Sequence, residues 1–169
     1  MALSEAERRE TFAALFSQMS PRLFRTALGI LGNPHDAADA LQDAGLKAYR
    51  YFDKLHQAEA GGAWLTRIVV NACYDVGRRR SRLVPTGLEP EREESAAPPD
   101  GTDWELVELL QRLPDEQRTA VVLRFFQDLS VPQIADLMGV PEGTVKSRLF
   151  TALGKLRVSL RKDREEGVR

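Results

Sequence analysis

Residues 129–156 read LSVPQIADLMGVPEGTVKSRLFTALGKL and predict two short helices joined by a tight turn. Ser130 is placed to cap the first helix, and Gly139 is placed to supply the left-handed residue that ends it. Beyond Pro141, apolar residues recur at the spacing of a second helix, so one side of that helix should face a core. These apolar residues are Val145, Leu149, Ala152, Leu153, Leu156 and Leu160.

The opposite side of the second helix is polar. It carries Thr144, Ser147, Arg148, Thr151 and Lys155. A helix with hydroxyls and cations on its free face, held by a shorter helix across a glycine-containing turn, is typical of the helix-turn-helix that enters a DNA major groove. The alternative is an ordinary helical hairpin whose polar face is only solvated, since this pattern also occurs in proteins that do not bind DNA.

The composition limits the class of protein. With 169 residues, of which 43% are hydrophobic and 29% charged, the chain can form one medium domain or two small ones. No apolar run reaches membrane-spanning length, and the polar N-terminus lacks the apolar core of a secretory signal. We therefore expect a cytoplasmic protein that does not insert into a membrane.

Residue types that carry chemistry are sparse. Cys73 is the single cysteine and falls on an apolar helical stripe, which favours a small core residue over a redox or metal-binding group. His35 and His56 have no metal-ligand partner at helical or loop spacing, and the chain contains no nucleophile constellation, P-loop or dinucleotide fingerprint. The sequence therefore predicts no enzyme, no metal and no cofactor.

The net charge of -1 conceals a segregation of charge along the chain. Residues 89–108 contain eight acidic residues and one basic residue, whereas residues 140–169 contain eight basic and four acidic residues. A second basic cluster, at residues 78–82, closes the first half. Two basic patches separated by an acidic stretch favour a polyanionic partner, because each neutralised phosphate releases counterions locally.

The first half of the chain predicts three helices. A helix from Ser4 to Phe16 is expected to restart at Ser20 and Pro21 and to end at residues 32–34. The next helix, from about residue 35 to 55, carries acids near its start and bases near its end. From the residues alone, this order is explained by the helix macrodipole.

The third helix has an apolar stripe that includes Leu65, Ile68, Val69, Ala72, Cys73 and Val76. Its far side carries Arg67, Asn71, Tyr74 and Arg78, whose groups bind phosphates, hydrogen-bond base edges and stack on unpaired bases. Trp64 lies at the junction with the preceding loop, where we favour a core residue over a base-stacking platform.

Residues 83–102 lack helical periodicity, and six of these twenty positions are Pro or Gly. They predict a linker that spans roughly 65–70 Å when extended and about 25 Å as a relaxed coil. Helices at about 104–112 and 115–127 then lead into the helix-turn-helix. Their expected core residues are Leu106, Leu109, Leu110, Leu113, Val121, Val122 and Phe125. The predicted fold is all-α, with two small helical domains joined by a flexible linker.

Three segments in this order resemble the extracytoplasmic-function (ECF) sigma factors of bacterial RNA polymerase. The sigma region 2 helix that docks on the clamp coiled coil of the largest subunit resembles residues 33–55, NPHDAADALQDAGLKAYRYFDKL. The following helix, which opens and reads the minus-10 element, resembles residues 63–82, AWLTRIVVNACYDVGRRRSR. Sigma region 4, which reads the minus-35 element as duplex, is similar to residues 113–153, LPDEQRTAVVLRFFQDLSVPQIADLMGVPEGTVKSRLFTAL.

The resemblance implies a division of the chain. Region 2, with three or four helices, is expected at residues 1–82, and region 4, with four helices, is expected at residues 103–162. The linker occupies residues 83–102, and a polar tail is expected at residues 163–169.

The resemblance also implies three sets of binding residues. For the acids of the second helix, it favours a role in docking over a purely electrostatic role toward the helix macrodipole. Core polymerase is expected to contact Asp36, Asp39, Gln42 and Asp43. The minus-10 DNA is expected to contact Gln57, Trp64, Arg67, Asn71, Tyr74, Arg78, Arg79 and Arg80, and the loop at residues 57–62 is expected to receive a flipped base. The minus-35 DNA is expected to contact Thr144, Lys146, Ser147, Arg148, Thr151 and Lys155.

The implied partners are core RNA polymerase, through its clamp and beta flap, promoter DNA and an anti-sigma factor. The protein would then be nucleoid-associated when bound to polymerase. Two alternatives remain open. One is a sigma mimic that binds an anti-sigma factor without contacting DNA, and the other is a stand-alone helix-turn-helix regulator whose first half serves as a sensor or dimerisation domain.

Overall fold

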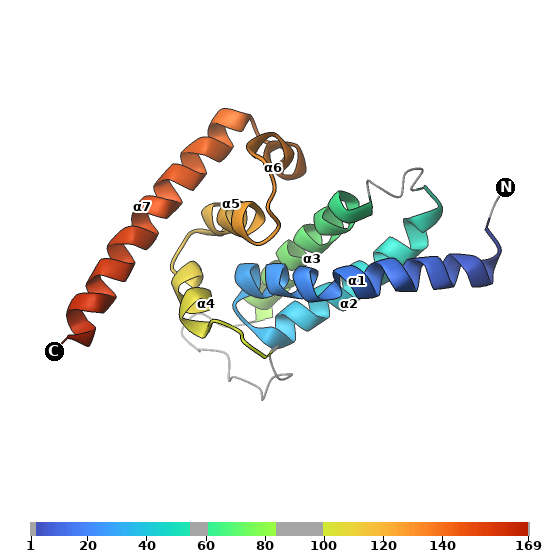
Figure 1. Ribbon diagram of the computed structural model, residues 1–169, viewed down its shortest axis with the longest axis horizontal. Coiled ribbons are helices and arrows are strands. Elements are labelled where there is room, and N and C mark those ends of the chain that lie inside the picture. The colour runs from blue at the N-terminus through green and yellow to red at the C-terminus, as the bar shows by residue number, and fades with distance from the viewer. Residues whose placement is uncertain (1–2, 55–60, 84–99, 169) are drawn as a thin grey trace.

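The structure is a computed structural model that describes residues 3–54, 61–83 and 100–168. Every regular element in these ranges is helical, so the predicted all-α fold is confirmed (Figure 1). The elements are α1 (Glu5–Leu31), α2 (Pro34–Tyr51), the short 3-10 helix η1 (Phe52–Lys54), α3 (Gly61–Leu83), α4 (Trp104–Gln111), α5 (Asp115–Phe125), α6 (Val131–Met138) and α7 (Glu142–Gly167).

The first half, residues 3–83, packs α1, α2 and α3 against one another. Asn33 caps α2, because its side chain accepts hydrogen bonds from the backbone N–H groups of His35 and Asp36. The buried side of α2 is made of small residues that let the neighbouring helices approach closely. These are Ala37, Ala40, Ala44 and Ala48, each with no exposed surface.

The expected restart of the first helix at Ser20 and Pro21 is wrong, since α1 continues through Pro21. Proline removes one backbone donor from a helix interior, which leaves the carbonyl of Ser17 without its partner, and Ser17 is exposed to water. The apolar residues Phe16, Met19 and Leu23 continue the same stripe across this point and pack on the core. Tertiary packing therefore outweighs the local helix-breaking signal.

The second half, residues 100–168, begins with α4 and α5 and ends with the helix-turn-helix. Ser130 and Gln133 form a reciprocal capping box at the start of α6, and Gly139 ends α6 in the left-handed conformation with φ 67°. Both local predictions are confirmed. The helix α7 extends to Gly167, so most of the polar tail expected from residue 163 is helical.

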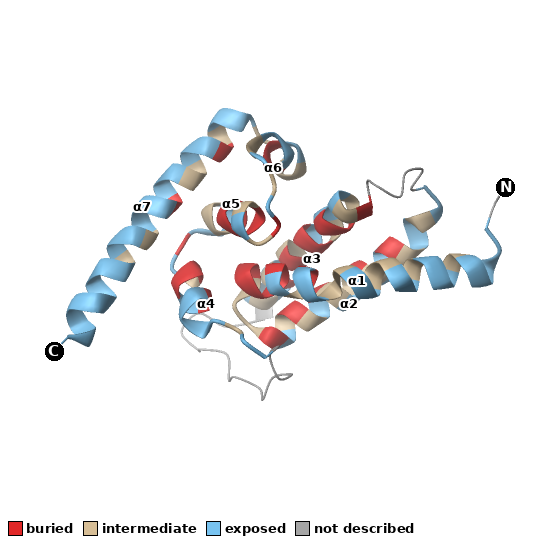
Figure 2. Cartoon of the chain, viewed as in Figure 1, coloured by how far each residue is buried: buried red, intermediate tan, exposed pale blue. Residues whose placement is uncertain are grey.

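Four residues that were expected in the second core are exposed. Leu106 and Phe125 instead line a groove of ≈ 630 Å³ with Arg22 and Arg25 of α1. Leu153 and Leu160 are exposed on α7, most of whose second half lies in solvent (Figure 2). Periodicity identified them as apolar, but no element of the described chain covers them fully.

The two halves pack against each other. Both α4 and α5 contact α1, and α5 lies between α1 and α7 (Figure 1). One continuous set of buried side chains includes Leu28 and Val70 of the first half and Leu110 and Val122 of the second. The sequence predicted the helices of each half but not this contact between them.

The glycine at the end of α6 gives a stability prediction. We expect Gly139→Ala to lower the free energy of unfolding by about 1–2 kcal/mol, because a Cβ disfavours the left-handed conformation. An added Cβ would meet no atom within 4 Å, so the loss would report backbone strain alone. Urea unfolding of the full chain measures it.

Gly154→Ala is the matched control, since Gly154 lies inside α7 with equally open space around it. Alanine at this helix-interior position should raise the free energy of unfolding by about 0.5–1 kcal/mol. Equal effects of the two substitutions would contradict the assignment of Gly139 as the left-handed cap.

Candidate nucleic-acid interface

The outer face of α3, defined by Arg67, Asn71, Tyr74 and Arg78, is turned partly toward the second half. The Arg67 Nη2 lies 2.7 Å from Asp136 Oδ2 on α6. The Tyr74 hydroxyl donates a hydrogen bond to Thr119 Oγ1 on α5 at 2.9 Å. Asn71, between them in sequence, is exposed. Two residues that were predicted to contact DNA therefore contact the other half of the chain.

The environment of Tyr74 differs from that of a free stacking platform. Its ring is half-buried, and burial raises the pKa of its phenol above the ordinary value, although the hydrogen bond with Thr119 acts in the opposite direction. The phenol is consequently neutral over the physiological range. The hydrogen bond to Thr119 joins this side chain to α5, while the residue keeps partial exposure to solvent.

The arginines that end α3 are paired with acids. Arg79 Nη2 lies 2.9 Å from Asp43 Oδ2, and Arg80 pairs with Asp36, so two acids predicted to bind polymerase instead neutralise two cations predicted to bind DNA. Arg78 pairs with Asp75 on its own helix. The pairs of Arg78 and Arg79 are exposed, and exposed pairs contribute about 0–1 kcal/mol, so an external partner can displace them at low cost. Asp36, in contrast, is mostly covered, with a side chain that is 16% exposed.

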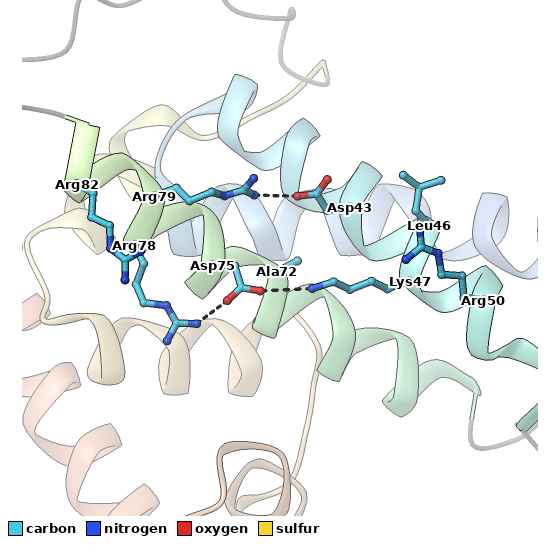
Figure 3. Close-up of a pocket in the computed structure, with 9 residues that line it drawn as sticks. All are labelled: Asp43, Leu46, Lys47, Arg50, Ala72, Asp75, Arg78, Arg79 and Arg82. Carbon is cyan, nitrogen blue, oxygen red and sulfur yellow. Dashed lines mark hydrogen bonds and ion pairs between the residues drawn. The ribbon is translucent and has the colours of Figure 1, made fainter.

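A groove of ≈ 590 Å³ runs between α2 and α3 beside these pairs (Figure 3). Lys47 and Arg78 both approach Asp75 in this groove. The hydrogen bond from Arg78, assisted by Lys47, holds the pKa of the Asp75 carboxyl below its ordinary value. The groove is lined by Asp43, Leu46, Lys47, Arg50, Ala72, Asp75, Arg78, Arg79 and Arg82.

The acidic side of α2 includes an apolar residue that the sequence reasoning missed. Leu46 is 60% exposed and lies one turn after Gln42 and Asp43. Asp39 and Gln42 are exposed, and Asp39 Oδ2 lies 3.6 Å from His35 Nε2. An exposed leucine within a polar ring has the anatomy of an interface centre. The signal in the sequence was a leucine two positions away from both Ala44 and Ala48 of the buried alanine stripe.

The polar face of α7 is mostly free. Lys146, Ser147, Thr151 and Lys155 are exposed, and Thr144 is half-buried. Arg148 differs from them, because its Nη2 pairs with Glu116 Oε2 of α5 at 2.9 Å and its side chain is only 18% exposed.

Phe150 is the residue on α7 that the sequence reasoning missed. It is 83% exposed and follows Lys146 and Ser147 by one turn of the helix. Helical spacing places position 150 away from Val145, Leu149 and Ala152, and this offset was the available signal.

The structure describes Trp64 but not Gln57, two residues that were predicted to contact the minus-10 DNA. Gln57, expected to contact the minus-10 DNA, lies outside the described residues, as do most positions of the loop at 57–62. Gly61 and Gly62 belong to α3. Trp64 is partly buried and packs against the core, in agreement with the structural interpretation of that residue.

Comparison with known proteins assigns the family. Residues 15–83 match the Sigma-70 region 2 family, and residues 103–156 match the family described as Sigma-70, region 4. The ECF RNA polymerase sigma factor SigM of Mycobacterium tuberculosis is 39% identical over 160 residues, which cover 92% of this chain and 80% of SigM. The chain belongs to the ECF RNA polymerase sigma factors. The ECF sigma factor SigW of Bacillus subtilis is 27% identical over 172 residues, covering 90% of each chain.

As a member of this family, the chain is a transcription initiation factor that directs promoter-specific transcription. Two solved structures share its fold at 24% identity. The sigma factor RpoE in complex with the anti-sigma factor NepR from Bartonella quintana gives a TM-score of 0.69, covering 90% of this chain and 96% of that one. CnrH in complex with the cytosolic domain of CnrY gives a TM-score of 0.68, covering 92% and 90%.

The described part of this sigma factor offers little other chemistry. Within residues 3–54, 61–83 and 100–168, no group of three or more His, Cys, Asp or Glu side chains could hold a metal ion. None of the described helices combines the length and hydropathy that a membrane span requires. Cys73 is buried in the first half, and burial raises the pKa of its thiol from 9.0 to about 12.

The thiol gives a prediction. Native protein should resist alkylation of Cys73 by iodoacetamide at pH 8, because the reactive thiolate is almost absent and the sulfur is covered. Denatured protein should incorporate one equivalent, as measured by mass spectrometry, and Cys73→Ala should incorporate none. The free energy of unfolding should also fall as the pH rises from 9.0 toward 12, because the unfolded chain releases a proton that the folded chain retains. Rapid labelling of native protein would contradict this burial.

Proposed function

We propose that this sigma factor docks on the clamp of the largest polymerase subunit through the exposed side of α2. Asp36, Asp39, Gln42 and Asp43 supply the polar contacts, and Leu46 supplies the apolar centre. The exposure of Leu46 beside these groups supports the assignment, because a buried apolar centre within a polar rim is typical of protein interfaces.

The outer face of α3, with Trp64, Gln57 and the arginines at positions 79 and 80, binds the minus-10 element. Asn71 hydrogen-bonds a base edge, and Tyr74 stacks on an unpaired base of the non-template strand. Melting costs about 1.4 kcal/mol per base step on average, and stacking on protein at about 1–3 kcal/mol per base offsets this cost. The cations hold the backbone and contribute no sequence preference.

The polar face of α7 reads the minus-35 element as duplex. The observation that carries this assignment is the capped α6 and the left-handed turn at Gly139, which hold α7 with Lys146, Ser147 and Phe150 exposed together. Thr144, Thr151 and Lys155 extend the contact along the groove, and Arg148 joins it when released from Glu116. Phe150 contacts a thymine methyl group, which is an apolar feature of the major groove.

Further partners follow from the family. The beta flap of polymerase binds the second half, and an anti-sigma factor masks the DNA-binding faces. The two solved relatives were each determined as complexes, and RpoE was bound to an anti-sigma factor. The protein acts in the cytoplasm and is nucleoid-associated when bound to polymerase.

Transcription with purified core polymerase tests the function. The full chain should direct run-off transcripts from specific starts on genomic DNA. The Leu46→Asp variant should bind core polymerase about tenfold or more weakly, because burying a leucine is worth about 1.5–3 kcal/mol. Leu3→Asp is the control, since Leu3 is 55% exposed at the far end of the first half. If the wild-type protein directed no core-dependent transcript, the function would be refuted.

A promoter identified in this way tests Phe150. Replacing the minus-35 thymines by uracil should weaken transcription by the wild type, whereas Phe150→Ala should be insensitive to the replacement because it no longer contacts the methyl group. The variant should lose about 1–3 kcal/mol of minus-35 discrimination. Val158→Ala, which removes another exposed side chain from α7, is the control. Equal sensitivity of Phe150→Ala and wild type to uracil would exclude the methyl contact.

A further inference from the structure

Arg148 lies at the edge of the polar face of α7. Val145, three positions earlier, and Ala152, four positions later, are fully buried, so the side chain of Arg148 leaves the helix next to its packed side. Only 18% of this side chain is exposed, whereas Ser147 and Thr151 are exposed residues. A cation at the edge of a helix in the major groove faces the phosphates of the groove wall more directly than the base edges.

Glu116 of α5 holds this cation. Its Oε2 lies 2.9 Å from Arg148 Nη2, and its side chain is 69% exposed. The neighbouring acid Asp115 is paired with Arg118 instead, at 3.1 Å from Nη1. Both α5 and α7 belong to the second half of the chain and pack on each other, so the pair of Glu116 and Arg148 does not require the first half.

A carboxylate and a phosphate bind an arginine through the same interaction. Each accepts charge-assisted hydrogen bonds from the N–H groups of a guanidinium, which stays protonated over the whole physiological pH range. Glu116 and a backbone phosphate would therefore compete for the Nη2 group of Arg148. The apparent affinity of such a contact falls by the fraction of molecules in which the arginine is free.

We propose that Glu116 is a positioning residue that competes with the DNA backbone for Arg148, and that Arg148 is a phosphate anchor. This inference rests on the proposed contact of the polar face of α7 with the minus-35 duplex. The pair lowers the affinity for duplex DNA of every sequence by the same factor, because a phosphate contact carries no sequence information. Promoter preference then depends on the other side chains of this face, and Glu116 sets how strongly the sigma factor binds duplex DNA in general.

Removing the carboxylate tests this competition. We expect Glu116→Gln to bind duplex DNA about fivefold more tightly if Arg148 is free in about one wild-type molecule in five. The gain should be equal on a duplex with the minus-35 sequence of a promoter mapped by transcription and on one with that sequence scrambled. The plot of log affinity against log salt, from about 50 to 200 mM, should become steeper by up to about 0.9, the effect of one more phosphate contact. Fluorescence anisotropy with the full chain measures both quantities.

Three matched variants isolate the pair. Glu108→Gln removes the same charge from an exposed position of α4 and should produce only the small general effect of charge. Glu116→Asp keeps the charge but shortens the side chain by a methylene group, so it should produce part of the gain. In the Arg148→Ala background, Glu116→Gln should have no effect beyond that of Glu108→Gln, because a residue that acts through Arg148 has nothing to act on there.

The outcomes separate this competition from the proposed function. A gain no larger than that of Glu108→Gln, or one that persists without Arg148, would overturn the competition. Weaker binding of Glu116→Gln with a lower free energy of unfolding would also overturn it, because the pair would then be a structural brace between α5 and α7. A gain confined to the minus-35 duplex would overturn the assignment of Arg148 as a phosphate anchor. Failure of the wild type to direct transcription with core polymerase would overturn the proposed function, while binding to the scrambled duplex would still report on the pair.

Discussion

The guanidinium of Arg118 joins the end of α4 to the end of α1, and the placement of the second half depends on this junction. It donates to the carbonyls of Leu110, Gln111 and Leu113 at the end of α4, and to that of Ile30 at the end of α1. Unpaired carbonyls at helix ends carry the negative end of the helix dipole, so one cation stabilises two helices there. Burial lowers the pKa of Arg118, and its neighbour Asp115 acts in the opposite direction. Since α6 and α7 pack on α5, which carries Arg118, the same junction also determines where α6 and α7 lie.

The two candidate DNA faces differ in their contacts with the rest of the chain. The face of α3 meets the second half through Tyr74 and Arg67, whereas α7 presents Ser147 and Phe150 to solvent. The acidic side of α2 pairs with the arginines of α3 and also carries the exposed Leu46. The proposed docking of polymerase on α2 and the proposed DNA contacts of the α3 arginines would thus involve the same carboxylates.

The sequence predicted the features that local chemistry determines. The cap at Ser130 and the left-handed turn at Gly139 depend on neighbouring residues only, and both are confirmed. Pro21 misled the prediction, because its local penalty is outweighed by packing that involves distant residues. Periodicity shows which side of a helix is apolar or polar but not what covers it. The contact of Tyr74 with Thr119, which are 45 positions apart, was therefore inaccessible to sequence reasoning.

The twenty-residue connection between the halves gives their contact a particular thermodynamic character. Joining two surfaces covalently converts their association into an intramolecular event, with an effective concentration in the millimolar range for short connections. Interactions too weak to hold two separate proteins together can therefore keep this chain folded back on itself. The packing of the two halves on each other is then independent of how much of the protein a cell contains, because both surfaces belong to one chain.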